Sequence, residues 1–598
     1  MGAPKWPPIA SSADMAAVTG IGRTRVFGWP RVSAWAWLPT LLLITVAVLT
    51  VTPVVTALLA GFRDAPPGRP GAISVESIRA SFAVMAQPEV WQILWTTVWL
   101  STVRAVLALA LAVVLAWIIA RTDCPFRDRL EFLLILSFFF PLLGKVLGWA
   151  LLLSPQKGYL NQVLRQLPFF AGDTGPLDIF SYGGLIFVSV TGWATLLAIF
   201  LVPAFRNMDA ALEESARMCG ASPRRTVVRI LVPLLRPAIL AAFILSLTRL
   251  LSSFETEVFL GTSSGIYVLT NKIYERMVQI FPPDFRTGMT MAVMLLVITF
   301  GLVLVNWRFL GKRDYTTVTG RGYSARPMAL GKLRWVAFGF VVLFFVITVV
   351  LPALMLIQVS FIRFIGLDVF EPASYTLDNW RRMLTLRVNR LALTNSLVMS
   401  IVATTVGMFL YSLVSYVVTK SRYRGRRLLD LVAWVPWAVP SLVLGLGILW
   451  AVLLSPLAIL YGTLTVMILA HIVRGFPFGT QIMGSSMIQI SRELEEAARI
   501  HKASWTSTFR RIWLPLVKNG FLAGWVIQFT VSFSDLATVA FLYGAKSTVL
   551  PTLFLSQWSN GRLEEAAVAA LMMTGVVLAV VVLVRRLVQG NVRTTTVA

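Results

Sequence analysis

The chain has 598 residues, of which 57% are hydrophobic and only 13% are charged, and its mean hydropathy is +0.77. Soluble proteins carry about 25% charged residues, so this composition excludes a string of soluble domains and indicates a polytopic membrane protein. The formal net charge of +26 raises the possibility of a nucleic-acid partner. The chain contains only two cysteines and two histidines, which predict neither a disulfide framework nor a metal centre built by the protein.

Twelve apolar runs are long enough to cross a hydrocarbon core of about 30 Å as helices. The segment before the first run carries Lys5 and Arg31 and no evident cleavage site, which indicates a start inside the cell rather than a removed signal peptide. With this orientation most Lys and Arg fall in inner segments, so the positive-inside rule and lipid headgroups explain the charge without nucleic acid. The predicted spans are 35–60, 92–119, 131–154, 183–205, 237–260, 288–308, 334–360, 394–418, 430–455, 462–485, 519–543 and 565–586.

The chain consists of two copies of one six-helix unit. Pro53 matches Pro352 at an offset of 299, and Glu131 matches Asp430 at the same offset. Because six is even, both copies cross the membrane in the same direction. The predicted fold is therefore an all-α membrane protein with twelve transmembrane helices in two parallel six-helix repeats. The predicted parts are a cytoplasmic segment 1–34, a first repeat 35–308, a cytoplasmic linker 309–333, a second repeat 334–586 and a cytoplasmic tail 587–598.

The loops after the fourth and tenth spans, residues 209–233 and 491–515, align at a single offset of 282. Asp209 and Ser491 are N-cap residue types, and acidic residues follow them where the helix dipole favours negative charge. Gly220 can adopt the left-handed conformation that ends a helix. Each loop therefore predicts a short helix–turn–helix that fits a partner's groove. The other matched pairs are Leu212 with Leu494, Glu214 with Glu496, Ser215 with Ala497, Ala216 with Ala498, Gly220 with Lys502, Ile230 with Ile512 and Pro233 with Pro515.

These loops resemble the signature of the permease subunits of binding-protein-dependent ABC importers, which reads E-A-A, three residues, G, nine residues and I-x-L-P. Glu214-Ser215-Ala216, Gly220 and residues 230–233 fit it, with Ser215 and Val232 as mild departures. The second loop fits closely except at Lys502, where the family has Gly, so the docking strength of that half is open. The fused 6+6 form is similar to the permeases of ferric iron, thiamine, polyamine and 2-aminoethylphosphonate uptake systems, of type I importer architecture.

The resemblance implies a division of labour between chains. Each loop would be a coupling helix inserted in an ATPase subunit, so that two copies of the ATPase carry ATP and Mg and a periplasmic binding protein delivers the substrate. Ferric iron is the first expectation for that substrate. The sequence has no G-x-x-x-x-G-K-[S/T] phosphate loop, so we expect no enzyme activity and no bound cofactor in this chain. The expected location is the bacterial inner membrane, with both termini in the cytoplasm.

Charged residues inside apolar spans are costly and indicate function by default. Glu255 and Glu257 fall near the outer end of the fifth span, and Asp535 falls in the corresponding part of the eleventh. The family resembled lines its translocation path with helices at these positions, and acidic groups there suit a cation. Alternatively, these acids lie at headgroup depth or pair with Arg249.

The cations in the spans favour the opposite substrate charge. Arg249 and Arg474 could balance the acids or attract an anionic or zwitterionic substrate, so the charge of the substrate stays open. Arg474 precedes Pro477, which predicts a break in the tenth span. Arg104 and Lys145 are expected to be structural or interfacial. His471 is expected to be a packing histidine rather than a ligand.

Two other classes of protein fit less well. A secondary carrier of the major-facilitator type is also 6+6 in parallel, but its Gly–Asp–Arg–basic loop is matched only faintly by residues 420–427 and not by 121–129. That hypothesis also leaves the twin loops unexplained. A membrane-embedded enzyme would need convergent Asp, His or Ser groups at one depth, and the sequence shows no such set.

Overall fold

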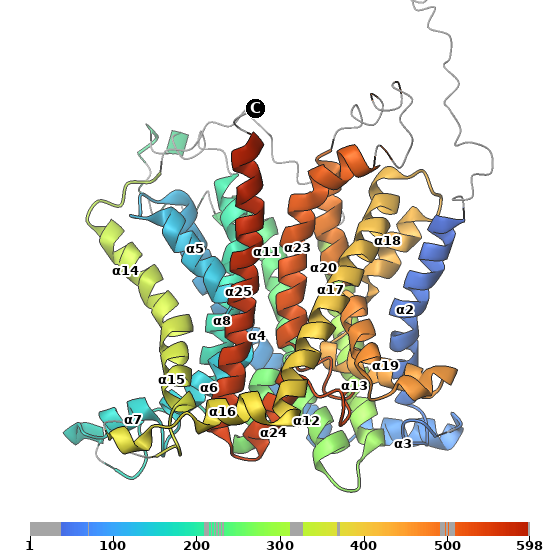
Figure 1. The fold of residues 1–598 in the computed structure, drawn as a ribbon, viewed down its shortest axis with the longest axis horizontal. Helices are drawn as coiled ribbons and strands as arrows, with labels where there is room; N and C mark the ends of the chain where they lie inside the picture. The colour runs from blue at the N-terminus through green and yellow to red at the C-terminus, as the bar shows by residue number, and fades with distance from the viewer. Residues whose placement is uncertain are drawn as a thin grey trace, which may run out of the picture.

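The computed structural model describes residues 37–69, 71–170, 172–207, 232–310, 327–366, 371–490 and 509–595, with residues 215, 216, 218–220, 222, 225, 229, 497, 500 and 507 (Figure 1). The regular structure in these ranges is helical, and the two β-bridges, Thr122 with Met328 and Ile362 with Tyr375, are isolated pairs. The prediction of an all-α fold is confirmed. Helices suit a membrane because they satisfy every backbone hydrogen bond within one segment.

The helices of each repeat follow one another in the same order, with short π-helical and 3₁₀ turns between some of them. The first repeat contains α2 (Leu38–Ala60), α3 (Val75–Met85), α4 (Pro88–Arg121), α5 (Arg127–Phe138), α6 (Leu142–Leu153), α7 (Tyr159–Leu164), η1 (Pro168–Phe170), α8 (Tyr182–Arg206), α11 (Val232–Leu251), η3 (Glu257–Gly261), η4 (Thr262–Ser264), α12 (Leu269–Tyr274), η5 (Glu275–Gln279) and α13 (Phe285–Leu310). The second repeat contains α14 (Leu333–Phe345), η6 (Val346–Val350), α15 (Leu351–Ser360), η7 (Pro372–Ser374), α16 (Asp378–Thr385), α17 (Arg387–Lys420), α18 (Arg426–Trp434), η8 (Val435–Ala438), α19 (Ser441–Leu453), η9 (Pro456–Leu460), α20 (Leu464–Ile488), η10 (Phe509–Trp513), α23 (Leu514–Ser534), α24 (Leu550–Ser559) and α25 (Leu563–Thr595).

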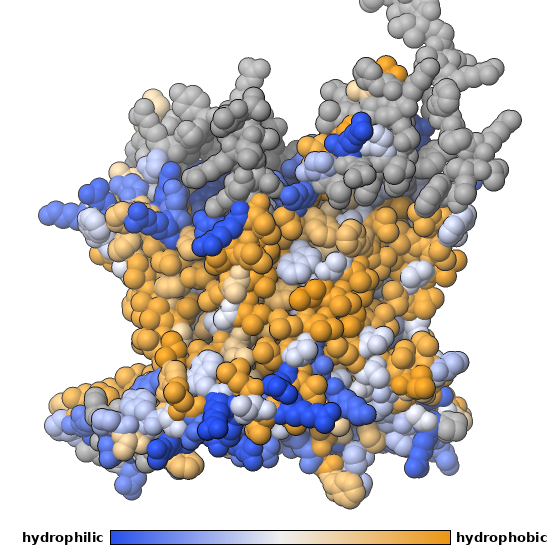
Figure 2. All heavy atoms as spheres, in the orientation of Figure 1, coloured by the Kyte–Doolittle hydropathy of each residue, from blue (hydrophilic) through white to orange (hydrophobic). Residues whose placement is uncertain are grey.

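The long helices run between two ends of the molecule (Figure 1). We call the end from which the loops 209–233 and 491–515 extend the coupling end, and the opposite one the distal end. Nine helical segments in the described ranges are long and apolar enough to span a membrane, and two bent helix pairs bring the number to eleven if each pair is one span. α23, at the place of the predicted eleventh span, falls outside this set and carries Lys518, Asn519 and Gln528. Figure 2 shows the resulting belt of hydrophobic residues, with hydrophilic residues at both ends of the visible face.

The third span of each repeat is bent, which the sequence prediction of straight helices at 131–154 and 430–455 missed. The axis turns by 91° between α5 and α6 and by 111° between α18–η8 and α19. Pro141 and Pro440 lie at the two breaks and directly precede the second helix of each pair. Proline removes a backbone donor and clashes with the preceding turn, so the chain changes direction there.

The fifth and eleventh spans also differ from prediction, because their helices stop early. α11 ends at Leu251 and α23 at Ser534, and a short helix, α12 or α24, follows each at the distal end; the stretch before α12 contains the short turns η3 and η4, whereas the stretch before α24 has no helix. By contrast, α20 is continuous through Pro477, so the predicted break in the tenth span is wrong. The acidic residues predicted for the path therefore lie where helices end.

The first helix of each repeat packs on the bent span of the other repeat. Gly447 of α19 lies so close to α2 that an added Cβ would be 2.1 Å from the carbonyl oxygen of Pro53. Gly148 of α6 repeats this contact with Pro352 of α15, where a Cβ would be 2.6 Å from the proline Cα. Thr56 of α2 donates a hydrogen bond to the Gly447 carbonyl at 2.8 Å. The two prolines that revealed the duplication thus mark equivalent contacts that join the halves.

Candidate functional site

The predicted coupling loops are described only in part. Asp209, Leu212, Glu214, Ile230, Ser491, Leu494, Glu496, Ala498 and Lys502 lie outside the described residues. In the first loop Ser215 is exposed and Ala216 is buried, and Gly220 has a φ of +78°, in the left-handed region. In the second loop Ala497 is exposed. Pro233 is the second residue of α11, and Ile512 and Pro515 lie at the junction of η10 with α23.

Neighbouring helices hold both ends of the loops in place. Arg206, the last residue of α8, forms two hydrogen bonds with the Glu131 carboxylate of α5, at 3.1 and 2.6 Å. In the second half Lys420 donates to the Ile490 carbonyl at 2.8 Å, and its ammonium lies 5.2 Å from the centre of the Trp513 ring. These contacts attach the loops to the second and third spans of their halves, so a force on a loop acts on the bundle.

A buried ion pair lies inside the first half. Arg104 of α4 pairs with Glu257 of η3, and both side chains are almost fully buried. Ser253 donates a second hydrogen bond to the Glu257 carboxylate at 2.7 Å. The Nε and Nη2 atoms of Arg104 have no hydrogen-bond partner in the described part of the chain. Glu257, a predicted path residue, thus pairs with Arg104 inside the first half.

The second half has its own ion pair, at other positions. Arg474 of α20 lies 2.7 Å from the carboxylate of Asp535, which directly follows α23. The backbone N–H of Thr538 donates to the other Asp535 oxygen at 3.2 Å. Asp535 is buried, whereas the Arg474 side chain remains 22% exposed. The second pair is therefore the more accessible of the two.

Glu255 and Arg249 extend this second pair across the boundary between the halves. The Glu255 carboxylate accepts a hydrogen bond from the Ala537 N–H at 3.4 Å, and it interacts electrostatically with Asp535 and Arg474. Arg249 does not form the predicted pair with Glu255 in the described structure; its guanidinium lies 4.0 Å from the centre of the Trp437 ring in the other half. We call Arg249, Glu255, Arg474 and Asp535 the inter-half cluster. It contains four of the five predicted path residues.

His471 adds an unpartnered group beside this cluster. It lies on α20 one turn before Arg474, is fully buried, and neither ring nitrogen has a hydrogen-bond partner among the described residues. It interacts electrostatically with Asp535 and Arg474. Buried polar groups are normally paired, so an unpartnered imidazole beside two charged side chains is unusual. The sequence treated His471 as a packing residue; its place beside Arg474 on the helix was the available signal.

The chemistry of the cluster suits transient contact rather than firm metal binding. No group of three His, Cys, Asp or Glu side chains in the described ranges is placed to hold a metal ion. Two acids and two bases instead neutralise one another in and near the membrane, which lowers the cost of burying each charge. The cluster joins the fifth span of one half to the tenth and eleventh of the other, so movement between the halves must change it.

Comparisons with known proteins agree with this architecture. Residues 30–310 and 403–594 match the family of binding-protein-dependent transport system inner membrane components. A Haemophilus influenzae protein, provisionally named a ferric transport system permease (FbpB 1), is 24% identical over 414 residues, which are 69% of this chain and 63% of that protein. The ferric transport system permease FbpB of Actinobacillus pleuropneumoniae is 24% identical over 433 residues, 69% of this chain and 59% of its own length.

The name of a third relative indicates a different kind of cation as its substrate. The spermidine/putrescine transport system permease PotB of Escherichia coli is 29% identical over 193 residues, 32% of this chain and 68% of PotB. The family match covers more than half of this chain in two segments that follow its two repeats. The chain therefore belongs to the family of binding-protein-dependent transport system inner membrane components, as a fused, multi-pass permease subunit.

Proposed function

We propose that this chain is the permease of an ATP-driven importer that moves ferric iron, delivered by a periplasmic binding protein, into the cytoplasm. The family match carries the importer role, and the names of the two ferric relatives support iron. Two copies of a separate ATPase bind one coupling loop each, because the loops are duplicated and the chain has no phosphate-binding loop of its own. The coupling end and both termini face the cytoplasm.

The inter-half cluster explains how a cation is passed between the halves. Asp535 and Glu255 offer carboxylates at the boundary, and in the present conformation Arg474 occupies the position of a cation at Asp535. A cationic substrate that arrives when the halves separate competes with Arg474 for that carboxylate. When the halves close, Arg474 returns and the substrate is released, so the site binds weakly enough to permit transport.

The polyamine relative supports a second candidate substrate. Spermidine and putrescine are cations too, so the same carboxylates would serve them, and the PotB match is higher in identity but covers only a third of the chain. The family match gives no support to a secondary carrier. Iron and polyamine are the alternatives that an experiment must separate.

The test is uptake by the complete transporter. Cells that express the chain with its ATPase and binding protein are given radiolabelled ferric citrate or radiolabelled spermidine, and we expect ATP-dependent uptake of iron only. The Asp535→Asn variant should lower uptake at least about tenfold, because a site that relies on one charged contact loses about 1.5–3 kcal/mol with it. The control is Glu371→Gln, which removes an exposed acid that lies outside the cluster. Uptake of spermidine alone would replace iron by polyamine, and uptake of neither would refute a cationic substrate.

A further inference from the structure

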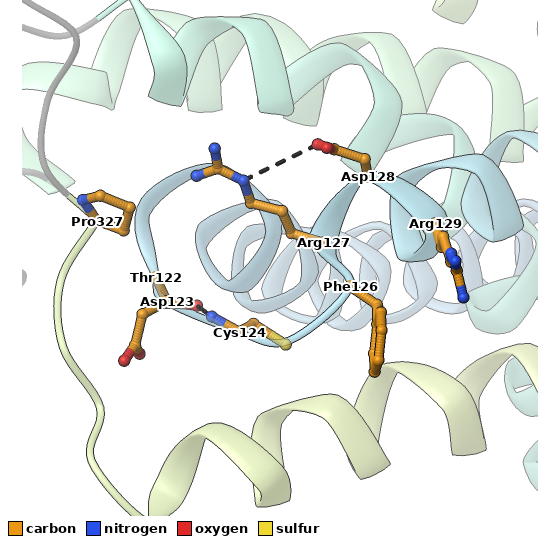
Figure 3. Close-up of a pocket in the computed structure, with 8 residues that line it drawn as sticks. All are labelled: Thr122, Asp123, Cys124, Phe126, Arg127, Asp128, Arg129 and Pro327. Atoms are coloured by element: carbon orange, nitrogen blue, oxygen red, sulfur yellow. Dashed lines mark hydrogen bonds and ion pairs between the residues drawn. The ribbon is translucent and has the colours of Figure 1, made fainter.

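A groove at the coupling end is bounded by the turn after α4 and by the end of the linker between the halves. The chain pairs Thr122 with Met328 in a parallel β-bridge, with hydrogen bonds from Asp123 N to Met328 O at 3.0 Å and from Met328 N to Arg121 O at 2.8 Å. The cavity has a volume of about 460 Å³. Figure 3 shows the lining residues, which are Thr122, Asp123, Cys124, Phe126, Arg127, Asp128, Arg129 and Pro327. The β-bridge makes this a built feature of the fold.

The exposed charge at the groove is basic. One Asp123 carboxylate oxygen accepts a hydrogen bond from Leu330 N at 2.8 Å, so this side chain is hydrogen-bonded to the end of the linker. Asp128 is highly exposed and lies 3.9 Å from Arg127, a weak pair in water. Arg127 and Arg129 are exposed at the groove, and Lys332 and Arg334 are exposed at the adjoining start of α14. The site therefore attracts an anion.

Aromatic residues next to the groove place it at the edge of the membrane. The Phe126 and Phe338 rings lie 6.0 Å apart, and Trp335 lies 6.1 Å from Phe338. The guanidinium of Arg129 lies 5.2 Å from the Phe126 ring, and that of Arg334 lies 5.9 Å from the Trp335 ring. Alternating aromatic and basic side chains are typical of the headgroup layer. Phe126 holds a left-handed backbone conformation (φ 55°), unusual for a bulky residue, with its ring half exposed.

The groove continues into a surface that lipid tails can cover. Leu333 and Val336 on the first turn of α14 are 64% and 66% exposed. Figure 2 shows hydrophilic residues over the upper ends of α5 and α14, directly above the hydrophobic belt. A ligand here must combine a negative headgroup with apolar chains. A free anion would leave the apolar part uncovered, and a protein partner would have to reach into the lipid layer.

We infer that this groove binds the headgroup of an anionic phospholipid such as phosphatidylglycerol, with its acyl chains along α14. Arg129, beside Phe126, contacts the phosphate, and Arg127 adds positive charge on the other side of the turn. The ring of Phe126 covers the glycerol region. The lipid contacts both the turn of the first half and the first helix of the second half, so it braces the junction between them. Basic pockets on the cytoplasmic side of membrane proteins bind such headgroups.

The test measures lipid retained by the full-length chain. The protein is purified from nanodiscs of equal phosphatidylglycerol and phosphatidylcholine and examined by native mass spectrometry. We expect wild-type protein to retain phosphatidylglycerol preferentially and Arg127→Ala/Arg129→Ala to lose about tenfold or more of it, since each basic residue near an anionic lipid contributes about fivefold. The matched control is Arg422→Ala/Arg424→Ala, which removes two exposed arginines from the corresponding turn of the second half and should retain the lipid.

Other outcomes would overturn the inference. Equal lipid retention by both double variants refutes the site. If the Arg127→Ala/Arg129→Ala variant keeps its lipid but loses the co-purified ATPase, the groove is a contact with a protein instead. A second measurement needs no variant: phosphatidylglycerol added to delipidated wild-type protein should raise its melting temperature, and phosphatidylcholine or inorganic phosphate should not. An equal shift with inorganic phosphate would replace the lipid by a soluble anion.

Discussion

Each half of the protein contains one buried ion pair, but the two pairs use positions that are not related by the duplication. At the offset of 299 that relates α4 to α17, Arg104 corresponds to Ala403, and at the offset of 282 Arg474 corresponds to Gly192. The pair of Arg104 and Glu257 is buried on both sides, whereas Arg474 is partly exposed. The two halves have therefore diverged, with a closed pair in the first and a more accessible pair at the boundary.

Breaking the closed pair should destabilise the protein more than removing it. Arg104→Met leaves Glu257 as a buried, uncompensated charge, which costs about 3–5 kcal/mol. Arg104→Met with Glu257→Leu removes both charges and should recover most of that loss. The measurement is the thermal unfolding midpoint of the purified chain in one detergent. A double variant that melts as low as the single one would contradict this account, because it would mean that packing rather than charge is lost.

At the scale of helices, the duplication predicts which contacts must be equivalent. Hydroxyl groups illustrate this at the distal end: Thr97 of α4 accepts a hydrogen bond from Leu269 N at 2.9 Å, and Ser396 of α17 accepts one from Leu550 N at 2.7 Å. Leu269 and Leu550 are the first residues of α12 and α24. The same side-chain chemistry thus attaches each short helix to the second span of its own half, while the first helices attach to the opposite half.

Adding one methyl group at the crossing of α2 and α19 should separate the halves. In Gly447→Ala the new Cβ would lie 2.1 Å from the Pro53 carbonyl, so a backbone must move, at a cost of about 1–3 kcal/mol. Gly148→Ala should behave alike at Pro352. Gly301→Ala on α13 is the control, since a Cβ there meets no atom within 4 Å and alanine favours a helix. Thermal midpoints rank the three variants; a Gly447→Ala protein as stable as Gly301→Ala would refute the close contact.

The sequence predicted the helices well and their interruptions poorly, for a physical reason. Apolar length and the repeat predict spans and a parallel duplication, because both depend on composition along the chain. Hydropathy does not register a change of direction inside an apolar run. Pro141 and Pro440, at the offset of 299, were the signal for the two bends, yet Pro477 lies inside the continuous α20. Whether a proline bends a helix depends on the neighbours that receive its freed carbonyls.

The sequence predicted which charged residues form the site, but not which of them pair with one another. Glu257, Arg104, Arg474 and Asp535 all stand out as charges in apolar spans, yet their partners lie on other helices. Sequence proximity suggested Arg249 for the acids, but the end of α11 at Leu251 breaks the helical spacing, and Arg249 instead stacks on Trp437. Only the packing of the helices determines which base meets which acid.

At the scale of the whole molecule, the proposed mechanism requires that the two ends change together. The loops of the coupling end are attached to α5 by Arg206 and to α17 by Lys420. The inter-half cluster lies near the other end, where α11 and α23 stop. α11 and α23 directly follow the loops, so a loop moved by an ATPase moves the same helices whose ends hold Glu255 and Asp535. Continuous helices transmit such a displacement with little loss.

Chemical labelling of the two native cysteines tests this arrangement, so no cysteine has to be introduced. Cys219 lies in the first coupling loop and is exposed, whereas Cys124 is buried in the turn after α4. Burial, with Asp123 beside it, raises the pKa of the Cys124 thiol above its ordinary value of 9.0, so it stays protonated at pH 7.5 and its labelling should increase only as the pH rises further. A membrane-impermeant maleimide should therefore label Cys219 and spare Cys124 in inside-out vesicles, and label neither in intact spheroplasts.

Binding of the ATPase should then protect Cys219. The proposed dock covers the loop, so labelling in inside-out vesicles should fall at least about tenfold when the ATPase is co-expressed, and the Cys219→Ser chain provides the background. Labelling from the spheroplast side would reverse the proposed orientation. Unprotected labelling with the ATPase bound would mean that the enzyme docks elsewhere, and the duplicated loops would lose their role as the points where ATP hydrolysis acts on the inter-half cluster.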